Sequence, residues 1–555
     1  MNSAYRTKLP ADPQKLRGGY YTPAPVAEFL IKWAVRTGKE RVLEPSCGDG
    51  NFLVPLIAHV HTLLPALRSD ARPRVVAVEV EPSELERAQV RVNAKPSKRV
   101  SIEWIGGDFF QAYPILRQPG FDVVIGNPPF IRFQYFEEES REVAFGHLRD
   151  VGYKPTKLAN AWAAFVQLSI ELLKSGGRLA MVLPAELLQV QYAHELRARI
   201  VSSFEHVVII GFRRLIFPEI QQEVVLLLAE GKRDVPAEDC DIHTIDISDA
   251  AELDADVMAR RISHTPARHS RVGMKWTALY LTEAAYKAID RAQGNKRLTA
   301  LGKLASVDVG IVTGLNAFFV VDDDRAKKVG AEKLSVPIIG KTGALKSILF
   351  GTDDFAAYRR LYPSRLLNLA GVPTREFPKK LLAYIKHGES EGAHTGYKCR
   401  IRKRWADVPS VYTPDAFLFR QIHSYPLLVL NGAGATSTDT IHRVRLKAEI
   451  DGSILSACFV NSLTFAWAEV AGRSYGGGVL ELEPREAEEL PVPYFADLVL
   501  DVEHIDKLLR GGEIDAALDY VDSRTLVERL GFSLAQTRAM RNAWRELSNR
   551  RISRK

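Results

Sequence analysis

Short apolar runs alternate with helical segments along the first 235 residues. Helical spacing of apolar positions is clearest in 161–174, which stops at a pair of glycines. The apolar runs between such segments are 41–44, 74–80, 100–105, 121–125, 178–183, 207–210 and 224–228. Buried runs of this length, separated by helices, are typical of a parallel sheet covered on both faces. We therefore predict a doubly wound, Rossmann-like α/β domain over residues 1–235.

The pattern changes after this domain. Residues 236–300 are rich in Asp, Ala and Arg and weakly periodic, which predicts a connecting region. Residues 301–495 have shorter apolar runs, more glycine, proline and aromatic residues and longer loops, which predict a mixed α+β domain. Residues 496–555 have helical periodicity and end in a basic tail. A length of 555 residues fits two or three domains of ordinary size.

Composition narrows the class of protein. Hydrophobic residues make up 46% and charged residues 26% of the chain, as in globular proteins. No apolar run approaches the roughly 20 residues of a membrane span, and the polar, basic N-terminus has no secretory signal, so we expect a cytoplasmic protein without a membrane partner. The cysteines lack the paired spacing of a metal site, so we expect buried thiols and no metal. They are Cys47, Cys240, Cys399 and Cys458.

A glycine-containing loop, 44–50, follows the first predicted strand, where doubly wound folds bind ligands. Gly48 and Gly50 allow a tight turn and close approach of the backbone to a ligand. The Gly-x-Gly-x-x-Gly pattern of dinucleotide sites is not met, because position 53 is Leu. An acid at Glu44 suits a cofactor with an ammonium group better than one with a pyrophosphate, and S-adenosylmethionine has that ammonium. We expect Glu44, Ser46 and Gly48 to bind this cofactor.

Two further acidic residues lie at the ends of the second and third predicted strands, in positions equivalent to that of this loop after the first strand. Glu79, at the end of the second strand, can accept hydrogen bonds from ribose hydroxyls. Asp108 follows the third strand, and its side chain can accept the adenine amine while Phe109 covers the ring. Glu79, Asp108 and Phe109 are predicted to bind S-adenosylmethionine, as is Asn127 after the fourth strand.

The segment Asn127-Pro128-Pro129-Phe130 follows a strand that ends in glycine and is the predicted catalytic loop. An exocyclic amine on a ring is a poor nucleophile because its lone pair is delocalised. The side-chain oxygen of Asn127 and the backbone carbonyl of Pro128 can each accept one N–H, which aims the lone pair at the methyl group of the cofactor. Consecutive prolines fix φ and remove competing donors, and Phe130 can stack on a base.

Together these segments resemble the gamma-class adenine-N6 DNA methyltransferases of restriction–modification systems, and the Taq-type enzymes most closely. The resemblance covers about residues 17–230 and includes the upstream segment Gly19-Tyr20-Tyr21-Thr22-Pro23. It implies that Thr22 closes over the methionine part of the cofactor and that Phe217, in a Phe-Pro segment, packs against a flipped adenine. It also implies a target recognition domain, expected at 301–495. Here Phe130 replaces the tyrosine that is frequent in the family.

The implied substrate is double-stranded DNA, from which the target base must be extruded. The stretch 359–420 holds 13 Lys and Arg against 5 Asp and Glu, a net charge of +8 that equals the net charge of the whole chain. We expect this stretch, with Trp405, Tyr412 and Phe417, to hold the DNA backbone. The chain is expected to act as a monomer, and a separate cognate endonuclease acting on the same site is compatible with the sequence.

Three other functions fit part of the pattern. An enzyme that methylates an RNA base or a protein glutamine has a similar catalytic loop, but its extra domain commonly precedes the cofactor domain. A non-catalytic DNA-binding subunit does not require the full set of acids with Asn127. A fused restriction–methylation enzyme requires a nuclease motif, and none is recognisable before residue 17 or downstream.

Overall fold

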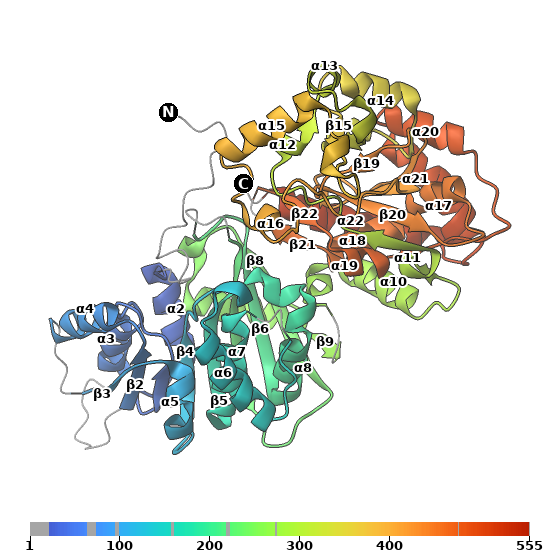
Figure 1. Cartoon of the computed structure of the whole chain (residues 1–555). Coiled ribbons are helices and arrows are strands. Elements are labelled where there is room, and N and C mark those ends of the chain that lie inside the picture. The colour runs from blue at the N-terminus through green and yellow to red at the C-terminus, as the bar shows by residue number, and fades with distance from the viewer. Residues whose placement is uncertain are drawn as a thin grey trace. The chain divides into compact units, whose positions relative to one another are not determined.

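The computed structural model describes residues 21–63, 74–94, 99–156, 160–217, 222–271, 275–475 and 477–553. The chain forms two compact units (Figure 1). The N-terminal unit consists of the described residues up to Tyr280, with Ser474–Gly478 and the residues from Arg550 onward. The C-terminal unit consists of Leu281–Arg473 and Val479–Asn549. Gly19, Tyr20 and Pro218, which belong to motifs noted above, lie outside the described residues.

A nine-stranded sheet forms the centre of the N-terminal unit. In spatial order its strands are β3 (Ser101–Gly106), β2 (Arg74–Glu79), β1 (Val42–Glu44), β4 (Phe121–Gly126), β5 (Leu173–Pro184), β7 (Val224–Lys232), β6 (Phe204–Phe212), β8 (Asp239–Ile247) and β9 (Arg268–Arg271). The first five strands are mutually parallel, and β6 is parallel to β8. The predicted Rossmann-like core is therefore confirmed.

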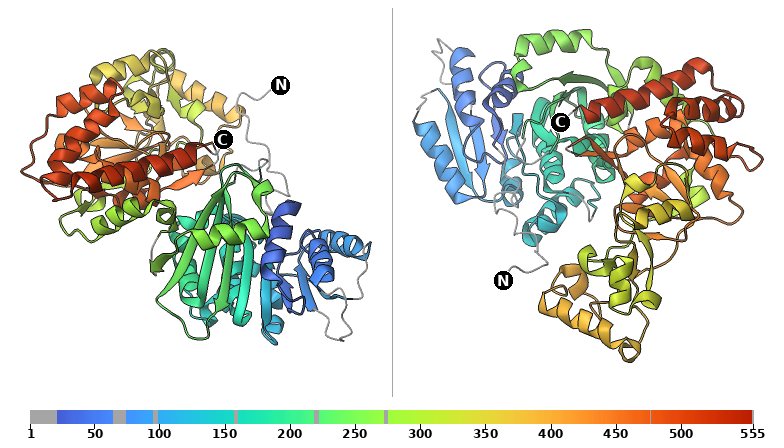
Figure 2. Two further views of the ribbon diagram at one scale, coloured as in Figure 1. Left: turned by 180° about the vertical axis from the view of Figure 1, so that it is seen from behind. Right: turned by 90° about the horizontal axis from the view of Figure 1, so that it is seen from above.

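Two groups of helices cover this sheet (Figures 1 and 2). One group is α2 (Ala24–Ala34), α3 (Leu53–Leu63), α4 (Pro82–Asn93) and α9 (Ala255–His264), and the other is α5 (Phe109–Leu116), α6 (Glu138–Asp150), α7 (Ala161–Glu171) and α8 (His194–Ser203). Alternate strand residues such as Ala77 and Val123 share a buried cluster with Leu30 of α2 and Leu53 of α3. Neighbouring strand residues such as Val76 and Val124 are equally buried, as expected for a sheet covered on both faces.

The sheet differs from the prediction at β7, which runs antiparallel to both of its neighbours. The connection from Phe212 to Val224 is shorter than the dozen or more residues that a parallel crossover needs, so β7 returns beside β6. The structure also differs in the predicted connecting region. Its first part forms β8, α9 and the antiparallel strand β9, and these extend the N-terminal sheet.

The C-terminal unit contains several small sheets. One sheet contains, in spatial order, β11 (Ala305–Asp308), β20 (Ile441–Leu446), β16 (Ala416–Phe419), β18 (Leu428–Asn431) and β14 (Leu349–Phe350). A second contains β12 (Val320–Val321), β15 (Arg365–Leu367), β13 (Ser335–Ile339) and β19 (Thr436–Ser437). Two smaller sheets contain β10 (Thr299–Ala300) with β23 (Pro491–Val492), and β17 (Gln421–Ile422), β22 (Val479–Glu481) and β21 (Arg473–Tyr475).

Helices surround these sheets. They are α10 (Glu283–Gln293), α11 (Leu301–Leu304), α12 (Asn316–Phe319), α13 (Asp323–Lys328), α14 (Thr352–Arg359), α15 (Lys379–Ser390), α16 (Tyr397–Arg400), α17 (Gly452–Phe459), α18 (Ser462–Ala471), α19 (Pro484–Glu488), α20 (Val502–Arg510), α21 (Ile514–Asp522) and α22 (Leu534–Ile552). The predicted helical C-terminal segment corresponds to α20–α22. Residues 311–411 have a hydrophobic cluster of their own, which includes Phe318, Leu367 and Leu381, and we call them the 311–411 lobe (Figure 2).

All four cysteines are buried thiols, as predicted. Among the described helices, none is by itself long and apolar enough to cross a membrane, and one bent pair, α17 with α18, passes by length and composition only.

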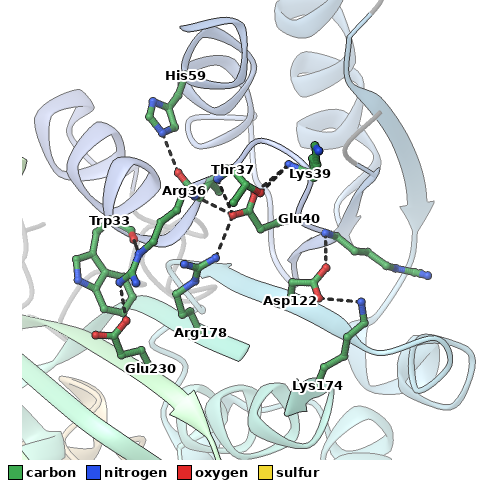
Figure 3. Close-up of polar contacts among 12 residues, drawn as sticks. Trp33, Arg36, Thr37, Lys39, Glu40, His59, Asp122, Lys174, Arg178 and Glu230 are labelled. Atoms are coloured by element: carbon green, nitrogen blue, oxygen red, sulfur yellow. Dashed lines mark hydrogen bonds and ion pairs between the residues drawn. The ribbon is translucent and has the colours of Figure 1, made fainter. Parts of the chain in front are cut away.

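A buried carboxylate, Glu40, holds the turn between α2 and β1 (Figure 3). It accepts hydrogen bonds from the backbone N–H groups of Arg36, Thr37 and Lys39 at 2.8, 2.9 and 3.1 Å. Arg178 on β5 donates to the same carboxylate at 3.0 Å. Burial acts to raise the pKa of Glu40, but the backbone hydrogen bonds outweigh it and lower the pKa below its usual value. Glu40 therefore fixes the entry to the first strand.

We predict that Glu40→Gln lowers the free energy of unfolding by about 2 kcal/mol at neutral pH, because an amide cannot accept all of these hydrogen bonds. A lowered native pKa means that the stabilisation is complete above the unfolded-state value of 4.5 and is lost as the pH falls through the native pKa. Urea unfolding across this range measures the difference, with the exposed Lys39→Gln in the same turn as the control. A difference that does not shrink in acid would contradict the assignment.

Candidate active site

A cavity of about 840 Å³ opens where the carboxyl ends of β1, β2, β3 and β4 meet. Parallel strands present their carboxyl ends at one edge of a sheet, so loops far apart in sequence converge there. The predicted site residues that line the cavity are Ser46, Gly48, Glu79, Asp108, Phe109 and Asn127. A second cavity, of about 670 Å³, lies between α2, α3 and α4 and holds none of the predicted residues.

The loop after β1 is held against the end of β2. Gly48 adopts a φ of +53°, and its N–H donates to Glu79 Oε2 at 2.8 Å. Glu79 Oε1 accepts the backbone N–H of Glu81 at 2.9 Å. Burial raises the pKa of Glu79, and these two backbone hydrogen bonds act against that rise. At Gly50, φ is +86° and a Cβ would lie only 3.2 Å from that of Ala88, so the turn requires glycine.

Glu44 and Thr22 are buried and are not among the residues that line the cavity. Glu44 is 1% exposed, and burial, with the nearby charges of Glu79 and Asp49, raises its pKa well above the usual value. Within the described part of the chain, Glu44 Oε2 and the buried Thr22 Oγ1 have no hydrogen-bond partner. A buried polar atom without a partner costs about 1–3 kcal/mol. A buried carboxyl oxygen and a hydroxyl left in this state fit an incoming group that carries an ammonium and a carboxylate.

Asp108 is fixed from two sides. Its Oδ1 caps α5 by accepting the N–H of Phe110 at 2.9 Å, and its Oδ2 accepts the hydroxyl of Ser140 at 2.6 Å. Phe109 is buried and stacks on Phe165 with ring centroids 4.9 Å apart, so only part of its ring faces the cavity. Sequence reasoning missed Ser140, because no motif marks a serine in the first turn of a helix, and only the packing of α6 against α5 brings it to Asp108.

The predicted catalytic loop is held at both ends. Ser46 Oγ in the loop after β1 donates to the backbone carbonyl of Asn127 at 3.3 Å. At the far end, the N–H of Ala161 donates to the carbonyl of Ile131 at 3.0 Å, and Asn160 Oδ1 accepts the N–H of Phe133 at 3.0 Å. The structure therefore joins the cofactor loop and the Asn-Pro-Pro-Phe loop directly.

Pro128, Phe130 and Phe217 do not line the cavity. Pro128 is buried, and Phe130 is half-buried against the hydrophobic cluster that contains Phe217. Phe217 is only 7% exposed, so its ring lies within this cluster in the structure. The two aromatic residues predicted to stack on the target base thus belong to one cluster.

The aromatic residues predicted to help bind DNA in the stretch 359–420 have structural roles. Phe417 is fully buried in β16, so its prediction is wrong. The Trp405 ring packs 4.9 Å from that of Phe318, and its Nε1 donates to Glu389 at 2.8 Å. Tyr412 donates to Asp308 at 2.7 Å. The sequence-level reasoning could not distinguish packing aromatics from exposed ones.

Two family models match most of the chain between them. One, described as N-6 DNA Methylase, matches residues 7–265, and one described as the C-terminal domain of type II methyltransferase M.Eco57I matches residues 273–526. The type II methyltransferase M.AccI of Acinetobacter calcoaceticus is 21% identical over 521 residues, which span 91% of this chain and 89% of that protein. M.XamI of Xanthomonas campestris pv. amaranthicola is 21% identical over 487 residues, or 87% and 86%.

A solved structure shares the fold over almost the whole chain. The type IIL restriction–modification enzyme MmeI, determined in complex with DNA, aligns with a TM-score of 0.53 and 12% identity over 95% of this chain and 72% of that one.

We predict that Glu44→Gln stabilises the ligand-free protein relative to wild type, increasingly so as the pH rises above about 4.5. The native pKa of Glu44 is raised, so the unfolded chain releases this proton first and wild-type stability falls with rising pH until the native pKa is reached. The difference should grow by up to about 1.4 kcal/mol per pH unit. Thermal unfolding from pH 4.5 to 8 measures it, with the exposed Glu86→Gln as the control. Equal stability of variant and wild type at every pH would contradict a buried, strained carboxyl.

Proposed function

We propose that this chain, which matches the N-6 DNA methylases over residues 7–265, transfers a methyl group from S-adenosylmethionine to N6 of a flipped-out adenine in double-stranded DNA. The observation that carries the proposal is the hydrogen bond from Ser46 to the carbonyl of Asn127, which fixes the catalytic loop beside the cofactor loop. We further propose that the enzyme is a cytoplasmic monomer that modifies the site of a separate restriction endonuclease.

The residues around the cavity fit S-adenosylmethionine part by part. Glu44, a buried acceptor, is placed to receive the ammonium group, and Thr22 the methionine carboxylate. Glu79 is oriented by two backbone amides and can accept the ribose hydroxyls. Asp108 keeps acceptor capacity for the adenine amine, and Ser46 and Gly48 supply the turn on which the cofactor lies. When bound, the cofactor supplies an electrophilic methyl group.

The catalytic loop positions the target amine. We assign Asn127 Oδ1 and the Pro128 carbonyl as acceptors of its two N–H groups, so that its lone pair points toward the cavity. Phe130 would stack on the extruded base, and Phe217, from the same cluster, would pack against it. Extrusion of the base costs a few kcal/mol, which stacking and these two hydrogen bonds offset. The residues thus act by orientation and electrostatics.

Methyl transfer from labelled S-adenosylmethionine tests the substrate class directly. We expect label in unmethylated double-stranded DNA, and digestion of that DNA to nucleosides should yield N6-methyladenine. Label found only in RNA or in a protein glutamine would overturn the proposal in favour of the alternative substrates.

We predict that Asn127→Ala slows methyl transfer roughly 10²–10³-fold while S-adenosylmethionine binds within about threefold of wild type. The side chain orients the target amine, and loss of one such acceptor costs roughly 10²–10³ in rate. Calorimetric titration and a labelled-transfer assay separate the two effects, with the exposed Asn93→Ala in α4 as the matched control. Undiminished transfer by Asn127→Ala would count decisively against this mechanism.

We predict that Ser140→Ala raises KM for S-adenosylmethionine roughly tenfold and changes kcat less than twofold, because a hydrogen bond to a carboxylate contributes about 1.5–3 kcal/mol. Ser140 positions Asp108. Ser140→Thr keeps the hydroxyl and should restore much of the affinity. Ser83→Ala, which lines the same cavity without contacting Asp108, is the control. A fall in kcat with unchanged KM would show that Ser140 does not act through cofactor binding.

A further inference from the structure

The 13 basic side chains of the stretch 359–420 divide into two groups. Five are bound to carboxylates or backbone carbonyls of the protein: Arg359, Arg365, Arg402, Arg404 and Arg420. The other eight are exposed and form no side-chain hydrogen bond or ion pair with any described residue: Arg360, Arg375, Lys379, Lys380, Lys386, Lys398, Arg400 and Lys403. All eight belong to the 311–411 lobe. This lobe therefore carries the cations of the stretch that are available to a partner.

Two large apolar side chains are exposed among these cations. Tyr397 is 63% exposed and Ile401 is 59% exposed, at the beginning of α16 and directly after its end. Lys398, Arg400 and Lys403 alternate with them along seven residues. Lys398 Nζ lies 5.7 Å from the centre of the Tyr397 ring. We call residues 397–403 the prong.

The prong is rigidly supported by the segment 312–316. Gly314 adopts a φ of +86°, and a Cβ there would lie 2.9 Å from Cys399 Sγ and 3.1 Å from Lys398 Cβ, so only glycine allows this approach. Arg402 donates to the carbonyls of Val312 and Thr313 at 3.0 and 2.8 Å. The buried Cys399 and the partly buried Arg402 thus anchor the prong, and its other five members are exposed.

On the basis of the proposed function, we propose that the prong docks on duplex DNA, with Tyr397 and Ile401 against the bases and the flanking cations on the phosphates. Apolar side chains that contact or part base steps, with cations beside them, are a recurrent means of holding bent or opened DNA. Exposed apolar residues surrounded by unpaired positive charges complement a polyanion with apolar base faces. A neutral protein surface would leave those charges without partners.

Equilibrium binding to a fluorescent duplex of mixed sequence tests the apolar part. We expect Tyr397→Ala/Ile401→Ala to weaken DNA binding roughly tenfold, as loss of a base-stacking side chain does, without changing S-adenosylmethionine affinity. The control is Val499→Ala/Leu534→Ala, which removes exposed apolar residues elsewhere in the C-terminal unit. Binding by the prong variant equal to that of the control would overturn the proposal.

The salt dependence of binding tests the cations. Lys398→Gln/Lys403→Gln should reduce the slope of log K against log salt concentration by about 1.8, because each phosphate contact contributes about 0.9. The control Lys507→Gln/Arg538→Gln removes exposed cations outside the lobe and should leave the slope unchanged. Equal slopes for the two variants would contradict phosphate contact by the prong.

Wild-type transfer distinguishes this inference from the function on which it rests. If the wild type methylates DNA and the prong variants bind DNA normally, the inference alone fails. If the wild type methylates only RNA or protein, the proposed function fails and the inference with it.

Discussion

The parallel pairing of β1 with β4 is the constraint on which the rest of the site depends. It places Val42 beside Val123 and Leu43 beside Val124, so two loops more than 80 residues apart in sequence leave the sheet side by side. At the other end of the pair, Asp122 accepts the N–H of Arg41 at 2.8 Å. Because the two strands are joined at their amino ends, the loops that follow their carboxyl ends lie within hydrogen-bond distance of each other.

The same geometry concentrates negative charge. Glu44 and Glu79 end adjacent strands, and burial raises the pKa of both, with further increases from the charges of Glu79 and Asp49 at Glu44 and from that of Glu84 at Glu79. Without a cation this arrangement opposes folding, because a charged carboxylate is separated from water. Under the proposed function, binding of the cofactor's ammonium group next to Glu44 would reverse the sign of that interaction. The ligand-free site is thus less stable than it could be, and binding would relieve the unfavourable electrostatics, so that affinity and specificity would depend on the same carboxylate.

The part of the site that the sequence predicts is the part that lies at strand ends. Glu79, Asp108 and Asn127 each follow an apolar run, and in a parallel sheet that position alone brings them together. Ser140 comes from a helix whose position depends on packing between α5 and α7, and no local pattern encodes it. The direction of a strand is likewise not encoded by its own residues. β7 has the composition of a parallel strand, but it runs antiparallel because the connection before it is short.

A count of charges along the sequence does not show which cations are bound within the protein. The chemistry of the side chains explains which ones are. Every engaged cation of the stretch 359–420 is an arginine, and every lysine there is exposed. A planar guanidinium offers five donors, so one side chain can join carbonyls from several segments, as Arg404 does with Leu369 and Val372. A lysine ammonium is strongly hydrated and gains less from such a site. In a basic stretch of a folded domain, an arginine can therefore either form internal hydrogen bonds or remain exposed, whereas the lysines lie on the surface that a polyanion can reach.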